Sequence, residues 1–118
     1  MPPVWRSDFD TSLWEKSLEE EYYRREQERL RVLTEVKDRL AAFFRGKRVK
    51  AAYLTGSLLR EGKFYDFSDV DIAVEGLEED YFSTLAALED AIDRQVDLIE
   101  LESCRFGQAI RESGLRIL

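Results

Sequence analysis

The sequence predicts an α/β (α+β) protein with a small mixed β-sheet, helices mainly on one face of it and a long N-terminal helix. Apolar residues recur every three or four positions over residues 11–45 and 78–93, which is the period of a helix packed on one side. Three short segments, 49–55, 69–74 and 96–101, alternate polar and apolar residues or are rich in β-forming residues. A chain of 118 residues has the size of one ordinary domain.

The N-terminal region is predicted as an irregular lead-in over residues 1–10 followed by one long helix or two abutting helices. Thr11 or Ser12 can cap the helix, and Gly46 is placed to end it. The charged run from Glu19 to Arg31 interrupts the apolar stripe, and we interpret it as a solvated helix face, with a surface for a partner as the alternative. The aromatic residues of this helix are expected to pack rather than to bind a ligand, while the two tryptophans could serve an interface.

The remaining segments are shorter and follow one another closely. The 78–93 helix should turn Tyr81, Phe82, Leu85, Leu88 and Ile92 inward. The expected elements after the long helix are a strand over 49–55, a helical turn over 57–62, a strand over 69–74, a helix over 78–93, a strand over 96–101, a helix over 103–113 and a short closing strand over 115–118.

Composition excludes several kinds of chemistry. One cysteine cannot form an internal disulfide, and the lack of histidine excludes His-based zinc sites and Ser-His or Cys-His dyads. Residues 1–50 carry a net charge of +2 and residues 51–118 a net charge of −9, so a long nucleic acid is an unlikely partner. No apolar run could span a membrane and no signal peptide is recognisable, which predicts a cytoplasmic protein with no membrane partner.

Three aspartates carry the chemistry that the sequence can support. Asp69 and Asp71 lie two positions apart in a predicted strand and therefore share one face, and Asp97 lies in another predicted strand that could adjoin it. Converging carboxylates suit two Mg²⁺ or Mn²⁺ ions, which would stabilise the attacking oxygen and the leaving pyrophosphate of a nucleoside triphosphate (NTP). Asp97 could also act as the general base.

A Gly-Ser step after the first predicted strand supplies a second half of such a site. Gly56 allows a tight turn and close approach to a phosphate, and a helix beginning at Ser57 would direct its free N–H groups at that phosphate. Arg60 lies one turn further and could neutralise phosphate charge. Each of these residues is a weak signal alone, but their order and their positions at strand ends make the set fairly specific.

The segment TGSLLREGKFYDFSDVDIAV, with the later Asp97, resembles the signature of the DNA polymerase β-like nucleotidyltransferase superfamily, and most closely its minimal nucleotidyltransferases (MNT). The resemblance implies a phosphate-binding turn at Gly56 and Ser57, metal ligands at Asp69, Asp71 and Asp97, and a phosphate ligand at Arg60. Ser68 matches a common serine before the paired aspartates. The eleven-residue spacer between Gly-Ser and Asp-x-Asp is longer than is usual, which affects the expected role of Arg60.

The resemblance covers residues 47–118 and implies a nucleotidyltransferase core, with residues 1–46 as a helical extension. MNT proteins often accompany a HEPN-domain protein, so the resemblance implies an antitoxin that transfers AMP from ATP to a tyrosine hydroxyl of a HEPN toxin. The alternative is a non-catalytic module that neutralises the HEPN partner by contact, and a third is transfer to a small molecule. A homodimer or hetero-oligomer could form through the N-terminal helix.

Overall fold

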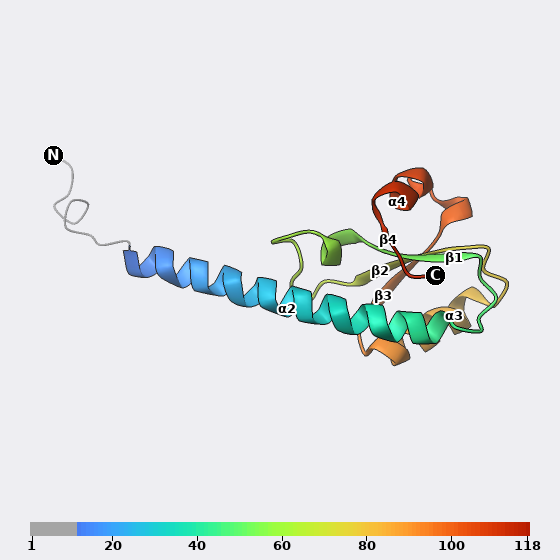
Figure 1. Cartoon of the computed structure of the whole chain (residues 1–118), viewed down its shortest axis with the longest axis horizontal. Helices are drawn as coiled ribbons and strands as arrows, with labels where there is room; N and C mark the ends of the chain where they lie inside the picture. The colour runs from blue at the N-terminus through green and yellow to red at the C-terminus, as the bar shows by residue number, and fades with distance from the viewer. Residues whose placement is uncertain (1–11) are drawn as a thin grey trace.

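A computed structural model describes residues 12–118, and the expected lead-in, Trp5 and the candidate cap Thr11 lie outside the described residues. A 33-residue helix, α2 (Ser12–Phe44), runs along the molecule and extends well past the sheet (Figure 1). Two stretches of α2 therefore have different surroundings, one beside the sheet and one projecting from it. Across residues 12–118, no helix combines the length and the apolar character needed to cross a bilayer.

Four strands form one mixed sheet in the order β3-β2-β1-β4. The strands are β1 (Ala51–Thr55), β2 (Val70–Glu75), β3 (Val96–Glu100) and β4 (Leu115–Arg116). β1 runs antiparallel to both β2 and β4, whereas β2 and β3 are parallel and are connected by the helix α3 (Tyr81–Ile92). The predicted mixed sheet is therefore confirmed.

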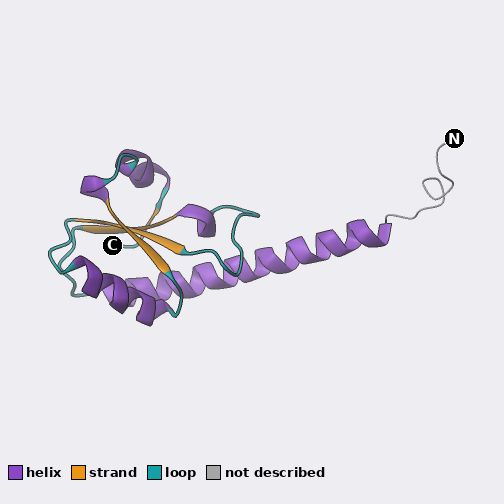
Figure 2. Cartoon of the chain, turned by 180° about the vertical axis from the view of Figure 1, so that it is seen from behind, coloured by secondary structure: helices purple, strands orange, loops and turns teal. Residues whose placement is uncertain are grey.

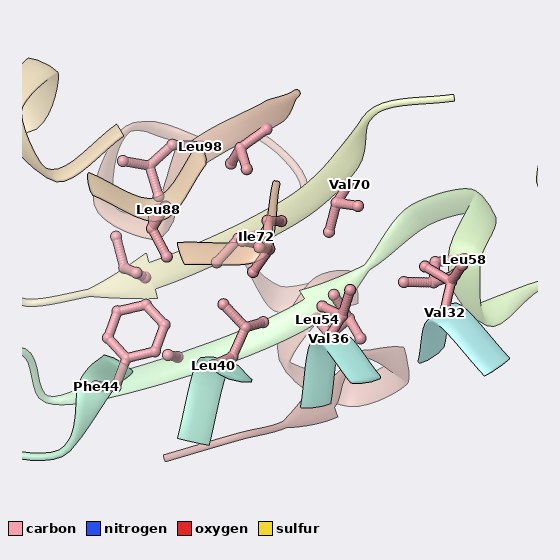
Figure 3. Packing of buried hydrophobic residues seen from close by; sticks show 14 of the residues in the cluster. Val32, Val36, Leu40, Phe44, Leu54, Leu58, Val70, Ile72, Leu88 and Leu98 are labelled. Atoms are coloured by element: carbon pink, nitrogen blue, oxygen red, sulfur yellow. The ribbon is translucent and has the colours of Figure 1, made fainter. Parts of the chain in front are cut away.

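Two helices cover one face of the sheet, and a short helix, α4 (Gly107–Ser113), lies on the other face (Figures 1 and 2). This confirms the prediction of helices mainly on one face. The main core lies between α2, α3 and the sheet, and Figure 3 shows the α2 side chains directed toward β1 and β2. Its fully buried side chains include Leu40, Phe44, Leu54, Ile72 and Leu88.

Several predicted boundaries differ from the structure for local reasons. α3 begins at Tyr81 rather than at 78, because the Asp80 side chain caps it by accepting a hydrogen bond of 2.9 Å from the Ser83 N–H. The predicted last helix over 103–113 begins later, as α4 at Gly107, and a 3₁₀ turn, η2 (Leu101–Ser103), precedes it. The closing strand pairs with β1 only over Leu115 and Arg116.

Some predicted core positions are wrong. Phe82 is exposed on α3, and in α2 the exposed residues include Trp14, Tyr23 and Leu30. Trp14 and Tyr23 therefore do not pack into the core of this chain as expected, whereas Phe44 at the other end of α2 does. Val32, by contrast, is buried and continues the stripe of core residues toward the N-terminus.

Candidate active site

Asp71 and Asp97 lie at paired positions on the two parallel strands β2 and β3. The residues that alternate with them, including Ile72 and Leu98, are buried in the core between the sheet, α2 and α3. Because successive side chains of a strand point to opposite faces, both aspartates lie on the face away from that core. The neighbouring hydrophobic cores therefore fix the backbone that carries both carboxylates. Asp69 directly precedes β2 and is exposed, as is Asp97.

The Gly-Ser step lies against the same aspartate pair. Thr55 pairs with Asp71 in the antiparallel ladder of β1 and β2, and Gly56 follows it with a φ of 80°. A Cβ atom at Gly56 would lie 1.9 Å from Asp71 Oδ2, which is far inside van der Waals contact. Only glycine therefore allows both this backbone conformation and the close approach of the Asp71 carboxylate.

The segment after Gly56 forms a shorter turn than the sequence predicts. A 3₁₀ turn, η1 (Gly56–Leu59), replaces the expected helical turn over 57–62, and the Arg60 N–H closes it on the Ser57 carbonyl at 3.0 Å. Ser57 is half-buried beside the aspartates' strand, whereas Arg60 is exposed and has an extended backbone. Within residues 12–118, the Arg60 side chain has no hydrogen-bond or ion-pair partner, and its predicted role stays a prediction.

Burial and like charge both act on Asp71. Burial of the half-buried carboxyl, followed by the charges of Asp97 and then Asp69, raises the pKa of Asp71 to about 6. The carboxylates of Asp97 and Asp69 are thus close enough to destabilise the charge of Asp71, and a cation beside it would relieve that repulsion.

The donor chemistry of this group fits a hard divalent cation, because carboxylate oxygens are the ligands that Mg²⁺ and Mn²⁺ prefer. Within the described part of the chain, no three acidic, Cys or His side chains are arranged closely enough to hold an ion together as they stand. A hollow of ≈ 350 Å³ beside the group includes Ser68 and Asp69 in its lining but not Asp71 or Asp97. Because Asp71 and Asp97 are in register, side-chain rotation is the change that would bring their oxygens onto one ion.

An ion pair on α2, which the sequence did not lead us to expect, is hydrogen-bonded to the η1 turn. The Arg29 guanidinium donates to the Glu26 carboxylate at 3.0 Å and to the Leu58 carbonyl at 3.0 Å. Glu26 Oε2 also accepts a hydrogen bond of 2.8 Å from the Gly62 N–H. Arg29 is only 8% exposed, so the expected solvated face is wrong for this part of the charged run.

Further contacts extend this attachment along the spacer loop. The Tyr22 hydroxyl donates to Glu61 at 2.7 Å, and the Arg25 guanidinium lies 4.6 Å from the centre of the Tyr65 ring. Ser68 Oγ accepts a hydrogen bond of 2.9 Å from the Tyr65 N–H, immediately before the paired aspartates. α2 thus fixes the loop from the end of η1 to the start of β2.

One signal in the sequence could have revealed the ion pair. Arg29 lies three and seven residues before Val32 and Val36, so it occupies the same helix face as the core residues. A charged residue within an apolar stripe has to be paired when it is buried, and Glu26 lies three residues away on the same helix. This pairing lowers the pKa of Glu26, first through the Arg29 hydrogen bond and also through the Gly62 N–H.

Comparison with known proteins identifies the fold to which this geometry belongs. Residues 38–118 match the family described as polymerase beta, nucleotidyltransferase. This chain belongs to that family. The expected superfamily is therefore confirmed, and the matched residues include η1, the three aspartates and the whole sheet of this nucleotidyltransferase-family chain.

Solved structures similar to this nucleotidyltransferase-family chain come from toxin–antitoxin complexes. A complex described as a toxin–antitoxin with AMP-PNP matches with a TM-score of 0.57 and 24% identity, covering 70% of this chain and 72% of the other. The MntA-HepT complex matches with a TM-score of 0.51 and 22% identity, covering 70% and 69%. A mutant of such a pair, with two aspartates changed to glutamate, matches with a TM-score of 0.57, 22% identity and coverage of 70% and 72%. No protein of curated function matches significantly.

Proposed function

We propose that this chain transfers a nucleoside monophosphate, namely AMP from ATP, to a hydroxyl group of a partner protein. The observation that supports this most is the paired position of Asp71 and Asp97 on parallel strands, with Asp71 lying against the glycine turn at Gly56. Membership of the nucleotidyltransferase family supports the reaction class. The AMP-PNP named for a structural neighbour supports ATP as the donor.

In this proposal the site residues divide the tasks of an in-line displacement, and Asp97 has two of them. Asp69, Asp71 and Asp97 would hold two Mg²⁺ or Mn²⁺ ions, which when bound would neutralise the negative charge on the attacking and leaving oxygens. The acceptor oxygen forms a bond to the α-phosphorus, the bond to the β-phosphate oxygen breaks, and pyrophosphate leaves. Asp97, the more exposed of the paired carboxylates, accepts the acceptor's proton. The η1 turn, with Gly56 and Ser57, binds the triphosphate, and Arg60 neutralises part of its charge.

The proposed partner is a HEPN-type toxin with a tyrosine as the acceptor. This extension comes from the resemblance to minimal nucleotidyltransferases and from the structural neighbours, which are named as toxin–antitoxin complexes. The division into an extension over 1–46 and a catalytic core over 47–118, and the cytoplasmic location, belong to the same proposal. The described fold carries few elements beyond the sheet and its helices that could enclose a large acceptor, which favours an acceptor presented by a second protein.

A non-catalytic antitoxin that acts by contact alone is the second candidate. The projecting half of α2, residues 12–23, exposes large apolar side chains that include Trp14 and Leu18. These side chains favour a protein-binding role for this chain. The two candidates differ in whether neutralisation of the partner needs the aspartates.

The test is incubation of the chain with α-labelled ATP, Mg²⁺ and the product of the adjacent gene, followed by detection of label on either protein. The proposal predicts label on the partner with wild type and loss of at least about a hundredfold with Asp69→Asn/Asp71→Asn. Asp90→Asn, an exposed aspartate on α3, is the matched control and should label normally. Neutralisation that persists in the double variant would support binding alone, and turnover of ATP without any protein partner would indicate a small-molecule acceptor.

A further inference from the structure

The projecting half of α2 carries an apolar stripe that residues 12–118 leave largely exposed, with only Tyr22 touching the spacer loop through its hydrogen bond to Glu61. Trp14, Leu18 and Tyr22 recur at intervals of four residues, and Figures 1 and 2 show this part of the helix standing away from the sheet. Trp14 is 67% exposed and Leu18 is 52% exposed. A shallow hollow of ≈ 360 Å³ lies on this surface and is lined by Leu18, Glu19, Tyr22 and Tyr23.

This stripe continues the face by which α2 packs on its own domain. Steps of three or four residues lead from Tyr22 through Arg29 and Val32 to Leu40, all on one side of the helix. An unsupported helix of about ten residues is marginal in water, and most helical stability in proteins comes from packing an apolar face. The geometry of the projecting half is therefore that of an interface whose other side lies on another molecule.

The charges beside the stripe favour one kind of occupant. Residues 13–23 hold four glutamates and one lysine, a net charge of −3. Glu19 and Glu21 flank Leu18 and Tyr22 on the two sides of the stripe, and both are exposed. We propose that the surface formed by Trp14, Leu18, Tyr22 and Tyr23 docks a basic amphipathic helix of a partner protein, with apolar anchors on the stripe and Lys or Arg beside the glutamates.

A second copy of this chain fits the surface less well. An antiparallel pair centred on Leu18 would place Glu21 opposite Glu15 of the second chain and would bring two segments of charge −3 together. In a register centred on Tyr22, the second helix would need the face at Arg29 and Val32. That face is buried under the chain's own η1 turn and core.

The test uses a Trp5→Phe background, in which Trp14 is the remaining tryptophan and reports on the stripe. Two synthetic helical peptides with the same leucine stripe are titrated into the full chain, one flanked by lysines and the other by glutamates. We expect a blue shift of Trp14 emission and binding of the lysine peptide at least about tenfold tighter than that of the glutamate peptide, with affinity falling as salt is added.

Three variants locate the binding. Leu18→Ala should weaken the lysine peptide about tenfold by removing an anchor, and Glu19→Gln/Glu21→Gln should remove most of the preference between the peptides. Phe106→Ala removes an aromatic side chain that is equally exposed but lies outside α2, and it should change nothing. Circular dichroism checks that each variant keeps its helix content.

The outcomes separate this proposal from others. Equal affinity for both peptides, or an unchanged affinity in Leu18→Ala, would overturn it. Sedimentation that finds a dimer dissolved by Leu18→Ala would overturn it in favour of a second copy. None of these measurements depends on nucleotide transfer.

Discussion

The two halves of α2 share one helix and one stripe but have opposite surroundings. From Arg29 to Phe44 the stripe is buried against the sheet, and the Glu26–Arg29 pair holds the η1 turn. From Ser12 to Tyr23 the same face is exposed and carries Trp14 and Leu18. The periodicity of a helix therefore identifies a face that will be covered, but it does not identify which molecule covers it.

This difference divides the chain by role. The buried half stabilises the domain and positions the loop that leads to the aspartates, so its substitution should affect both stability and nucleotide binding. Apart from Tyr22, whose hydroxyl bonds Glu61, the projecting half contacts little of the domain, so substitution of Trp14 or Leu18 should affect association only. The predictions below test this division in order of decreasing expected effect.

The largest effect should come from removing a leucine from the buried half. Leu40 is fully buried between α2 and the sheet, so Leu40→Ala should reduce the free energy of unfolding by about 2–5 kcal/mol through lost burial and a residual cavity. Leu18→Ala, the same substitution in the projecting half, should change it by less than about 0.5 kcal/mol. Urea unfolding followed by circular dichroism measures both, and similar losses in the two variants would contradict the division.

The next largest effect should come from breaking the Glu26–Arg29 ion pair that is bonded to η1. Arg29→Met leaves Glu26 in a largely buried position with only the Gly62 N–H as a partner, and it should cost about 1–3 kcal/mol. The same variant should weaken ATP binding, because the Leu58 carbonyl loses its donor and the turn is less well fixed.

The matched control for this pair lies on the same helix. Arg31 pairs with Glu28 and Glu35 on the exposed side, so Arg31→Met should leave both the free energy of unfolding and ATP binding almost unchanged. If calorimetry gave both arginine variants the same ATP affinity, the positioning role of Arg29 would be wrong.

Two glycines with the same backbone conformation test the contact between the turn and Asp71. Gly56 and Gly46 have φ values of 80° and 84°, so alanine should cost about 1 kcal/mol of strain at either position. At Gly56 the new Cβ would also meet Asp71 Oδ2, whereas nothing lies within 4 Å at Gly46. Gly56→Ala should therefore lower the free energy of unfolding by about 1 kcal/mol more than Gly46→Ala does. Of the two variants, only Gly56→Ala should lose nucleotide transfer.

The smallest effect is a pH dependence in metal-free buffer. Burial, Asp97 and Asp69 raise the pKa of Asp71 in the folded chain to about 6, whereas its pKa in the unfolded chain is about 4. The contribution of this carboxyl to stability is therefore fully present below a pH of about 4 and is lost as the pH rises through 6. Asp71→Asn cannot ionise and therefore avoids this loss of stability. Its Tm should exceed that of wild type by a few degrees at pH 7.5 and by almost nothing at pH 4. Glu20→Gln, in the projecting half, should follow wild type throughout. A constant difference between Asp71→Asn and wild type across this range would contradict the assignment.

Much of the fold follows from local patterns in the sequence. Alternation placed Asp71 and Asp97 opposite to the apolar residues of their strands, and the structure adds the register that sets them side by side. The turn at Gly56 was also predicted, but its contact with Asp71 depends on the pairing of β1 with β2, which no local pattern specifies.

What the sequence could not specify involves residues that are distant in the chain. The role of Arg29 depends on Leu58 and Gly62, which are brought under α2 only by the complete fold. The exposure of Phe82 and Trp14 has the same origin, because helical period shows which residues share a face but not where the neighbouring surface ends. The roles proposed for Ser57 and Arg60 remain predictions.

Electron paramagnetic resonance of Mn²⁺ in the presence of AMP-PNP tests most directly whether the aspartates form one cation site. Wild type should bind Mn²⁺ together with the nucleotide, and Asp97→Asn should lose that binding while Asp90→Asn retains it. Binding of Mn²⁺ and AMP-PNP by Asp97→Asn with the affinity of wild type would contradict the account, as would the absence of any such binding by wild type.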